Sequence, residues 1–465
     1  MQKYAAILTP LQTHQKAALR RALQNNLILA HSTGSGKTLT SIAIADALGK
    51  PTTVLTPASL VTNFQKELQK HKQGGPPVNV VSLPTAVLHD YKIPKGNTVI
   101  IDEAHSLRNS GTARQEYIKR QLENAGRVIA LTGTPAYNNI EDWAPLVNIV
   151  SRQNIVPEDT KAFREKFIQE KQIRPSWLDR LIYGAKPGVV TTLKNADKLR
   201  KLLRPYVDVF DTDVEKPERI DEDYYAEMPP EQEQIYRYAD KSLPMALRWK
   251  VRHNIPPSKS EAKMMNAFLQ DVRQISNTPE GFQLGANPGA KLIMAARFLK
   301  EMREKDPHFR ALVYSNYLGS GIDSYGRILD SYGIPYNKFT GSMSSKQKKE
   351  VVDAYNSGEV PIILGSGSAS EGLDLQGTKL IQLLEPHFNN SKLNQVIGRG
   401  IRYKSHEMLP PEERKVRVQR FFSTLPETRG FLGLSKHKDT SVDEYMKSRA
   451  AEKDELIRQV KEVLT

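Results

Sequence analysis

Short apolar runs alternate with amphipathic stretches in two separate blocks of the sequence, residues 26–140 and 310–423. Runs of this length, bounded by turn residues, are typical of buried parallel strands, and the stretches between them are typical of helices that cover such a sheet. The runs are Asn26–Ala30, Thr53–Thr56, Thr98–Asp102 and Arg127–Thr132 in the first block, and Ala311–Ser315, Pro361–Gly365, Leu380–Leu384 and Val416–Arg420 in the second. We therefore expect an α/β fold with two parallel sheets in tandem, each binding ligands at the carboxyl ends of its strands.

A chain of 465 residues is too long for one compact core, and its composition changes between the two blocks. Residues 151–285 are rich in charge and helix formers, with brief strand-like signals near Val207–Phe210 and Tyr224–Glu227. We predict a first lobe over 1–150, a mostly helical insertion and connection over 151–285, and a second lobe over 286–440. Ser441 and Glu444 have the spacing of a capping box, which predicts that residues 441–465 form a helix bracing one lobe.

The composition restricts the chemistry and the partners. Lys and Arg number 67 against 52 Asp and Glu, giving a formal charge of +15, which favours a polyanionic partner such as nucleic acid, although a basic protein without one has the same charge. Without cysteine, disulfides, cysteine-based zinc sites and thiolate nucleophiles are excluded. The chain has no run of 18 apolar residues and its start, MQKYAAILTP, lacks the layout of a signal peptide, so we expect a cytoplasmic protein without a secretion signal.

The segment His31–Thr38 follows a predicted strand and precedes the helix-like run Leu39–Leu48. This is the context of a phosphate-binding loop, in which glycines let backbone N–H groups approach phosphate and the helix N-terminus adds its positive end. Lys37 would reach the terminal phosphates of ATP and Thr38 would hold Mg²⁺. The remaining loop residues that we assign to nucleotide binding are Thr33, Gly34, Ser35 and Gly36. A chance Gly-Ser loop before a helix is the alternative interpretation.

Acidic and hydroxyl side chains end the next strands of this block. Asp102 and Glu103 follow the run Thr98–Ile101, where carboxylates suit a metal-bound phosphate: Asp102 would hold Mg²⁺ and Glu103 would orient or deprotonate the attacking water. Alone, an Asp-Glu pair is more often a solvated loop. Thr132 and Thr134, in Leu131–Pro135, could sense the phosphate, although a plain turn after a strand fits the same pattern.

These three motifs, in this order, resemble those of the superfamily-two helicases, and the residues around them are similar to the SWI/SNF-like ATPases. The resemblance spans most of the chain and implies two RecA-like lobes with ATP in the cleft between them. The segments that carry it outside the second block are Pro57–Leu60 with Asn63, Phe64 and Glu67, the continuation of the Asp102–His105 box through Leu107–Asn109, Asn138, Asn139 and Trp143, and the inter-lobe segments Gln232–Tyr236 and Arg273–Asn277.

The second block contains the remaining motifs of that family in order: Thr340–Ser342, Gly365–Leu375 and Gln395–Arg402. The resemblance implies that Arg399 and Arg402, three residues apart on one helix face, reach across the cleft to the γ-phosphate as arginine fingers. It also places Gln395 in the catalytic set and His105 at the nucleotide. Gln15 would read adenine, which implies a preference for ATP.

The sequence departs from the family pattern at several places. His31 stands where the phosphate loop commonly has glycine, Pro205–Asp208 where two arginines are common, Ser370 and Glu371 in place of a glycine pair, and Asp374 in place of Asn. The stretches Glu385–Asn389, Arg402–His406 and Leu409–Pro410 look closer to helicases of large DNA viruses and phages. Chromatin remodelling is therefore disfavoured, and the host cytoplasm is the expected location.

We accordingly expect an ATP- and Mg²⁺-dependent, monomeric motor that moves on duplex or branched DNA with little sequence preference. It would remodel forks, junctions or protein–DNA complexes, branch migration included. Candidate contacts to the DNA backbone are Ser59, Leu60, Thr340, Gly341, Ser342, Ser366 and Gly367. Two alternatives stay open: a strand-separating helicase on DNA or RNA, and a nucleic-acid-binding scaffold with a degenerate ATPase.

Overall fold

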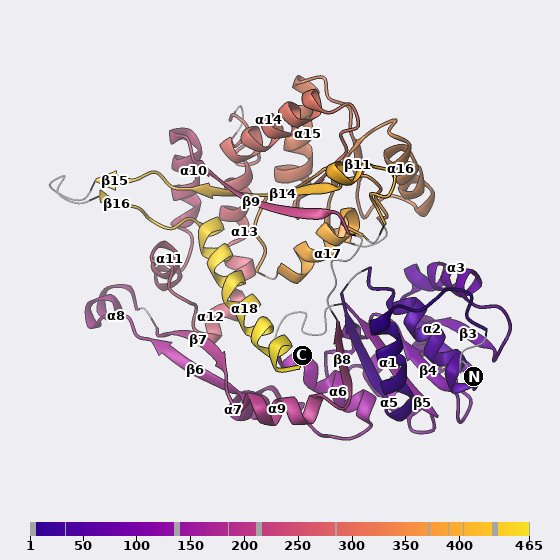
Figure 1. Ribbon diagram of the computed structural model, residues 1–465. Helices are drawn as coiled ribbons and strands as arrows, with labels where there is room; N and C mark the ends of the chain where they lie inside the picture. The colour runs from indigo at the N-terminus through magenta and orange to yellow at the C-terminus, as the bar shows by residue number, and fades with distance from the viewer. Residues whose placement is uncertain are drawn as a thin grey trace. The chain divides into compact units, whose positions relative to one another are not determined.

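The computed structural model describes residues 6–32, 34–133, 140–184, 186–210, 216–283, 286–370, 373–388, 390–402, 404–429 and 436–464. The chain divides into two compact units, which are described separately (Figure 1). We call the first unit, residues 1–169, 191–212 and 455–465, the first lobe; the second lobe is residues 170–190 and 213–454.

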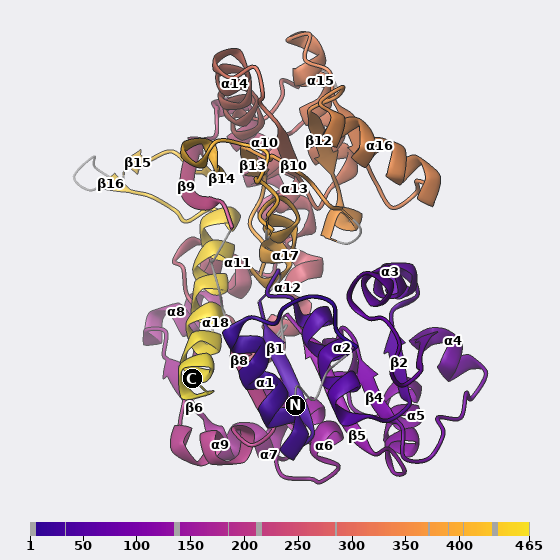
Figure 2. The same ribbon diagram turned by 45° about the vertical axis from the view of Figure 1, so that its right-hand side comes forward.

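The first lobe is built on a six-stranded parallel sheet with the order β3-β2-β4-β5-β1-β8 (Figure 2). Its strands are β1 Leu27–His31, β2 Thr52–Thr56, β3 Val78–Ser82, β4 Thr98–Ile101, β5 Arg127–Thr132 and β8 Val207–Phe210. Strands β1, β2 and β4 are buried along their whole length, because helices cover both faces of the sheet.

Alternate residues of these strands point into two different cores of the first lobe. Leu29 packs with helices α1 and α2 on one face, whereas Ile28 packs with α5 and α6 on the other. The helices of this lobe are α1 Thr13–Gln24, α2 Lys37–Leu48, α3 Val61–His71, α4 Leu83–Leu88, α5 Ala113–Leu122, α6 Trp143–Ser151, α7 Thr160–Phe167 and α9 Ala196–Leu203.

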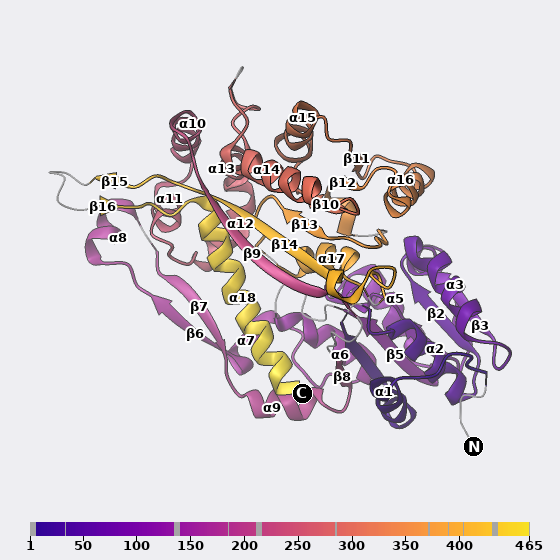
Figure 3. The same ribbon diagram turned by 45° about the horizontal axis from the view of Figure 1, so that its top comes forward.

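The second lobe contains another six-stranded parallel sheet, ordered β11-β12-β10-β13-β14-β9. Its strands are β9 Glu218–Glu227, β10 Ala311–Tyr314, β11 Asn337–Phe339, β12 Ile362–Gly365, β13 Leu380–Leu383 and β14 Lys415–Thr424. The two long strands β9 and β14 pair in register from Glu218 opposite Lys415 to Glu227 opposite Thr424 (Figure 3). Helices α14 Ala290–Lys305 and α15 Ser324–Ser331 cover one face, and α16 Ser345–Ser357 and α17 Asn390–Gly400 the other.

A helical cluster completes the second lobe, and a separate hairpin is divided between the two lobes. The cluster contains α10 Pro230–Asp240, α11 Met245–Arg252, α12 Lys259–Phe268, α13 Gln270–Asn277 and the start of α18 Val442–Leu464. Strands β6 Ile168–Ile173 and β7 Gly188–Leu193 form a two-stranded sheet joined through α8 Trp177–Tyr183, and β15 Thr428–Arg429 pairs with β16 Lys436–His437. No helix in the described ranges is long and apolar enough to cross a membrane.

The two parallel sheets confirm the fold class expected from the sequence, and each predicted run coincides with a strand. The capping box of α18 is also present: Ser441 N–H donates to Glu444 at 2.9 Å and Glu444 N–H donates to Ser441 Oγ at 3.2 Å. Residues 151–285, expected as a mostly helical insertion and connection, contain helices and also the two strand-like signals noted in the sequence. Their strand β8 lies in the first sheet, β9 lies in the second, and their residues are divided between the two lobes.

Candidate active site

The phosphate loop lies between β1, which ends at His31, and α2, which begins at Lys37. Gly34 and Gly36 have φ angles of 81° and 76°, a left-handed conformation that favours glycine. A Cβ atom at Gly36 would lie 2.5 Å from Nε2 of Gln15, so a larger residue would collide with that side chain. The loop therefore has the tight turn that the sequence predicted, and the glycine at 36 is needed for both backbone and space.

Lys37 folds over this loop. Its Nζ donates hydrogen bonds to the backbone carbonyls of His31 at 2.8 Å and Ser32 at 3.0 Å. Thr38 follows in the first turn of α2, which carries no acidic residue and no side-chain cap on its N-cap residue. Amides at the start of such a helix are suited to an anionic ligand.

Asp102 and Glu103 directly follow β4 at the same edge of the first sheet. Oδ2 of Asp102 accepts a hydrogen bond from the Thr56 hydroxyl at the end of β2 at 2.9 Å, and Oδ1 accepts one from the Glu103 N–H at 3.0 Å. Burial and the neighbouring Glu103 carboxylate raise the pKa of Asp102 to about 6, although these hydrogen bonds and Lys37 act in the opposite direction. Thr56 was not predicted. Its position at the end of a parallel strand adjacent to β4 is the signal that could have identified it.

This carboxylate fits a site for Mg²⁺. In the described part of the chain, the hydrogen bonds to Asp102 come only from a hydroxyl and a backbone amide, so its charge is not matched by a bonded cation. No cluster of three or more His, Cys, Asp or Glu side chains suited to a metal occurs among the described residues. Magnesium commonly takes one or two protein ligands and completes its shell with water and substrate phosphates. Thr38 and Asp102 would hold it, and it would neutralise phosphate charge.

Glu103 adopts a left-handed backbone conformation with φ 48°, which is uncommon outside glycine. Its carboxylate lies 3.1 Å from Nδ1 of His105. Strained backbone is often retained where it aims a functional side chain. His105, predicted to lie at the nucleotide, contacts the residue predicted to position the attacking water.

Gln15 and His14, at the start of α1, contact the phosphate loop. Gln15 is buried; its Oε1 accepts from the Gln12 N–H at 2.9 Å and its Nε2 donates to the Gly36 carbonyl at 3.3 Å. His14 lies 3.0 Å from the Ser35 carbonyl through Nε2 and stacks on Phe210 at a centroid distance of 3.7 Å. Thus Gln15, which was predicted to read adenine, contacts the phosphate loop. The stacked pair of His14 and Phe210, which the sequence did not indicate, lies beside the same loop.

His31 and Asp208, two separate departures from the family pattern, contact each other. The His31 ring is fully buried and its Nε2 lies 2.7 Å from Oδ2 of Asp208; Asp208 also pairs with Arg21 at 2.5 Å. Burial disfavours ionisation of Asp208, but the hydrogen bond and charge of His31 and the charge of Arg21 hold its pKa below the usual value. The parallel pairing of β1 with β8 brings the two residues together. This hydrogen bond fixes the first residue of the phosphate loop to the neighbouring strand.

The second-lobe arginines are arranged differently from the prediction. Helix α17 contains Gln395 and Arg399 but ends at Gly400, so Arg402 lies beyond it and the two arginines do not share a helix face. Arg402 instead donates to Asp374 at 3.0 Å and to the Leu373 carbonyl at 3.0 Å. The expectation of one helix face was wrong, because a Gly-Arg-Gly sequence terminates the helix. Asp374, where the family commonly has Asn, positions Arg402.

The candidate DNA contacts follow three strands. Ser59 and Leu60 lie in a short 3₁₀ helix after β2; Thr340–Ser342 follow β11; Ser366 and Gly367 follow β12. Because β11 pairs with β12, the last two groups lie at the same edge of the second sheet. Ser366 is buried and its N–H donates to the Phe339 carbonyl at 3.1 Å, so this amide is used within the lobe. The exposed members of the set are Ser59, Gly341, Ser342 and Gly367.

Some predicted positions lie outside the described residues, namely Thr33, Thr134, Pro135, Asn138, Asn139, Glu371, Gly372, Asn389 and Tyr403. Thr132 is described and is buried at the end of β5.

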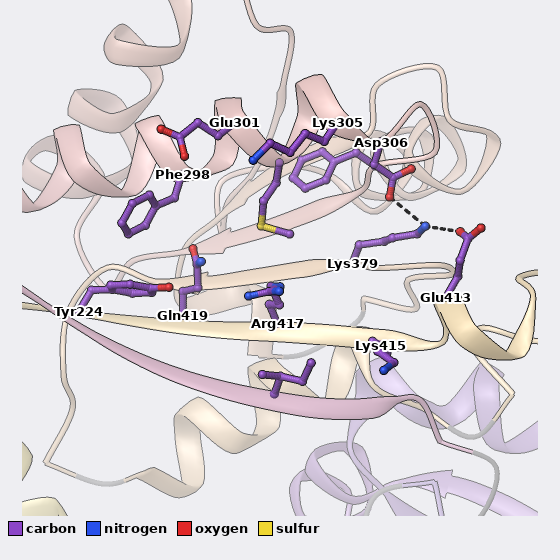
Figure 4. A pocket seen from close by; sticks show the side chains of 13 residues that line it. Tyr224, Phe298, Glu301, Lys305, Asp306, Lys379, Glu413, Lys415, Arg417 and Gln419 are labelled. Carbon is purple, nitrogen blue, oxygen red and sulfur yellow. Dashed lines mark hydrogen bonds and ion pairs between the residues drawn. The ribbon is translucent and has the colours of Figure 1, made fainter.

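A pocket of about 520 Å³ in the second lobe lies between α14 and the strands β9 and β14 (Figure 4). Its apolar side chains include Tyr224 and Phe298, and Lys379 pairs at its rim with Asp306 at 2.9 Å and with Glu413 at 2.5 Å. None of its lining residues belongs to the predicted site, and its charged groups are largely paired.

Comparison with known proteins agrees with these motifs. Residues 78–281 match the SNF2-related domain family and residues 292–404 match the helicase conserved C-terminal domain family. A protein of Acanthamoeba polyphaga mimivirus, named as an ATP-dependent RNA helicase, is 31% identical over 96% of this chain and 94% of its own length.

More distant similarities are consistent with the same family. The termination factor NPH-I homolog of African swine fever virus (isolate Pretoriuskop Pr4) is 24% identical, with 92% of this chain and 74% of that protein covered. The human DNA repair and recombination protein RAD54-like is 23% identical, with 80% of this chain and 57% of that protein covered. The Hef helicase domain of Pyrococcus furiosus has the same fold, with a TM-score of 0.51, 14% identity and coverage of 89% of this chain and 95% of that one. The chain therefore belongs to the SNF2-related ATPases of the superfamily-two helicases, a family of ATP-hydrolysing enzymes with two RecA-like lobes.

Proposed function

We propose that this protein is an ATP-driven motor that moves along duplex or branched DNA and remodels forks, junctions or protein–DNA complexes. The observation that carries the ATPase half is the set of Lys37, Thr56 and Asp102 at the carboxyl edge of the first sheet, beside a phosphate loop with the required backbone. In parallel α/β sheets this edge is where ligands bind.

Each residue has a chemical role in the proposed reaction. Lys37 neutralises the terminal phosphates, and Thr38 and Asp102 hold Mg²⁺. Glu103 orients or deprotonates the attacking water, while Arg399 and Arg402 stabilise the charge that develops on the transferred phosphoryl group. Phosphoryl transfer depends mainly on such positioning and charge neutralisation. Because Arg399 and Arg402 belong to the second lobe, we propose that ATP turnover couples the two lobes, which is how hydrolysis would drive movement.

The DNA half of the proposal rests on charge, on exposed residues and on a relative. The formal charge of +15 favours a polyanion, and exposed hydroxyl and glycine residues follow strands at the sheet edges of both lobes. One relative is named for DNA repair and recombination.

A strand-separating helicase acting on RNA or DNA is the second candidate, favoured by the name of the mimivirus relative. A scaffold with a degenerate ATPase is disfavoured, because Lys37, Asp102, Glu103, Arg399 and Arg402 are all present.

ATP hydrolysis with no nucleic acid, with duplex DNA, with single-stranded DNA and with RNA tests the proposal. We expect duplex or forked DNA to stimulate turnover, and Lys37→Ala to abolish it. Lys50→Ala, just beyond the same helix and exposed, is the matched control and should be unchanged. Stimulation by RNA alone would favour the second candidate, and unchanged turnover in Lys37→Ala would show that the site is wrongly assigned. Displacement of a third strand from a triplex, compared with unwinding of a fork, then distinguishes duplex tracking from strand separation.

A further inference from the structure

The helix α8 exposes an unusual number of large apolar side chains. Thirteen such side chains are exposed in the described part of the chain, and five of them, Ile173, Trp177, Leu178, Leu181 and Ile182, lie within ten consecutive residues. Trp177 is 66% exposed and Leu181 is 74% exposed. We call residues 170–190, which contain α8, the α8 arm; Figures 1 and 3 show α8 at the end of the hairpin formed by β6 and β7. A contiguous exposed apolar group of this kind commonly marks an interaction surface.

The shape of α8 is maintained without a hydrophobic core. None of its residues is buried. Instead, Ser176 and Asp179 form a capping box at its start, and Gly184 ends it with a φ angle of 62°. At the C-terminal end of α8, the Tyr183 ring stacks on Trp249 of α11 at 5.8 Å, and a Cβ atom at Gly188, the first residue of β7, would lie 2.5 Å from the Pro256 carbonyl. The arm thus contacts the helical cluster at these two positions, while the side chains of Trp177, Leu178, Leu181 and Ile182 stay exposed.

The charges of the α8 arm are predominantly positive. It contains four basic residues, Lys171, Arg174, Arg180 and Lys186, and two acidic residues, Glu170 and Asp179. The four basic side chains are exposed and make no hydrogen bond or ion pair within the described ranges. Asp179 is engaged in capping α8, where it accepts a hydrogen bond from the Ser176 hydroxyl at 2.5 Å. The surface therefore combines unpaired cations with an aromatic ring and branched aliphatic groups.

We infer that the α8 arm binds unpaired bases of DNA next to a duplex, at a fork or junction. Unpaired cations suit phosphates, and Trp177 offers a face on which a base can stack. In an intact duplex the base faces are covered by their neighbours, whereas apolar side chains can insert where stacking is broken. The bases of a branch point are already unstacked, so Trp177, Leu181 and Ile182 can contact them without that cost. This inference rests on the proposed DNA motor and specifies the DNA structure on which it acts.

Binding of the 465-residue chain to three fluorescent probes tests the inference: a blunt duplex, a fork with two single-stranded arms, and a single strand. We expect Trp177→Ala to weaken fork and single-strand binding by about five- to a hundredfold, with little change for the duplex. Trp177→Phe should retain most of the affinity, because the ring face remains. Arg174→Gln combined with Arg180→Gln should weaken binding to the fork and reduce its salt dependence. Tyr238→Ala is the matched control, since Tyr238 is 80% exposed on α10 of the same lobe.

The outcomes separate this inference from the proposed function. If the unaltered protein binds DNA and shows DNA-stimulated ATP hydrolysis while Trp177→Ala binds the fork as tightly as before, the inference is wrong and the motor proposal is unaffected. If the unaltered protein binds none of the probes, the proposed DNA motor is wrong, and the inference about the α8 arm is wrong with it. A second copy of the chain is the other possible partner of α8, and sedimentation of the unaltered protein and of Trp177→Ala tests for it. Self-association that the substitution abolishes would mean that α8 contacts a second copy of the chain, which overturns the assignment to DNA.

Discussion

Replacing Asp102 with Asn should make the protein more stable and inactive. The ordinary pKa of this carboxyl is 3.8 and the folded protein raises it to about 6. A difference of about 2 units corresponds to about 3 kcal/mol that opposes folding when Asp102 is ionised. Because part of the side chain remains accessible, we take about 3 kcal/mol as an upper bound. Asn can keep both contacts, because its side-chain NH₂ can donate a hydrogen bond to the Thr56 hydroxyl and its side-chain oxygen can accept one from the Glu103 N–H.

The sign of the pH dependence follows from the raised pKa. Above pH 6 the folded and unfolded states are both ionised and the full penalty applies to Asp102. As the pH falls below 6, the folded state takes up a proton that the unfolded state still lacks, so the unaltered protein gains stability. The advantage of Asp102→Asn should therefore be greatest near pH 7.5 and fall to about half at pH 5.

Urea unfolding in EDTA, followed by tryptophan fluorescence at pH 7.5 and pH 5, measures this difference. ATP hydrolysis measured in parallel should be lost. Asp90→Asn is the control, because Asp90 is an exposed carboxyl whose pKa is lowered by the hydrogen bond from Lys92, and the substitution should not stabilise the protein. Asp102→Asn that is less stable than the unaltered protein at pH 7.5, or a difference independent of pH, would refute the reasoning.

Three further predictions concern the loop support, the arginine and the DNA. Asp208→Asn should lower the free energy of unfolding by about 1–3 kcal/mol. It should also raise KM for ATP more than it lowers kcat, because the contact of Asp208 with His31 supports the phosphate loop. Since the folded protein holds the pKa of Asp208 below 3.8, this stabilisation is present above pH 3.8 and is lost as the pH falls through the pKa of the folded state. Unchanged KM and stability would contradict that role. Arg402→Lys, which cannot bridge Asp374 and the Leu373 carbonyl in the same way, should reduce kcat by about a thousandfold in steady-state assays, and full activity would show that Arg402 is not a finger. The logarithm of the association constant for duplex DNA should fall linearly with the logarithm of the salt concentration, with a slope of about −0.9 for each neutralised phosphate. An association constant that does not change with salt would argue against contacts to the DNA backbone.

The strands most easily predicted from the sequence were those buried on both faces. Each of β1, β2, β4, β10, β12 and β13 is a short, fully buried run, and a fully buried parallel strand needs an apolar residue at nearly every position. One edge strand of each sheet was missed for the opposite reason. Strand β3 is only partly buried, and β11 has three residues, so neither has a distinctive apolar run.

The local geometry of the candidate site was predictable where strand, loop and helix are consecutive in the chain. Gly34 and Gly36 lie in the loop between β1 and α2, Lys37 begins α2, and Asp102 directly follows β4, as expected from the sequence. Contacts between distant segments could not be predicted from a single motif. Thr56 meets Asp102 across 46 positions, and the helix end at Gly400 separates Arg402 from Arg399, so both features depend on pairing and termination that the motif alone does not specify.

The pair of His31 and Asp208 illustrates why departures from a family pattern should be considered together. A buried histidine at the end of β1 needs a polar partner, since an unpaired polar group in that position costs free energy. Strand β8 provides it, because parallel pairing with β1 aligns Asp208 beside the end of that strand. The histidine in place of glycine at 31 and the acid at 208 are therefore explained together, because each side chain is the hydrogen-bond partner of the other. Strand β8 is also the last strand of the first lobe before the chain passes to residue 213 of the second. The hydrogen bond between His31 and Asp208 therefore joins the first residue of the phosphate loop to the last strand of the first lobe.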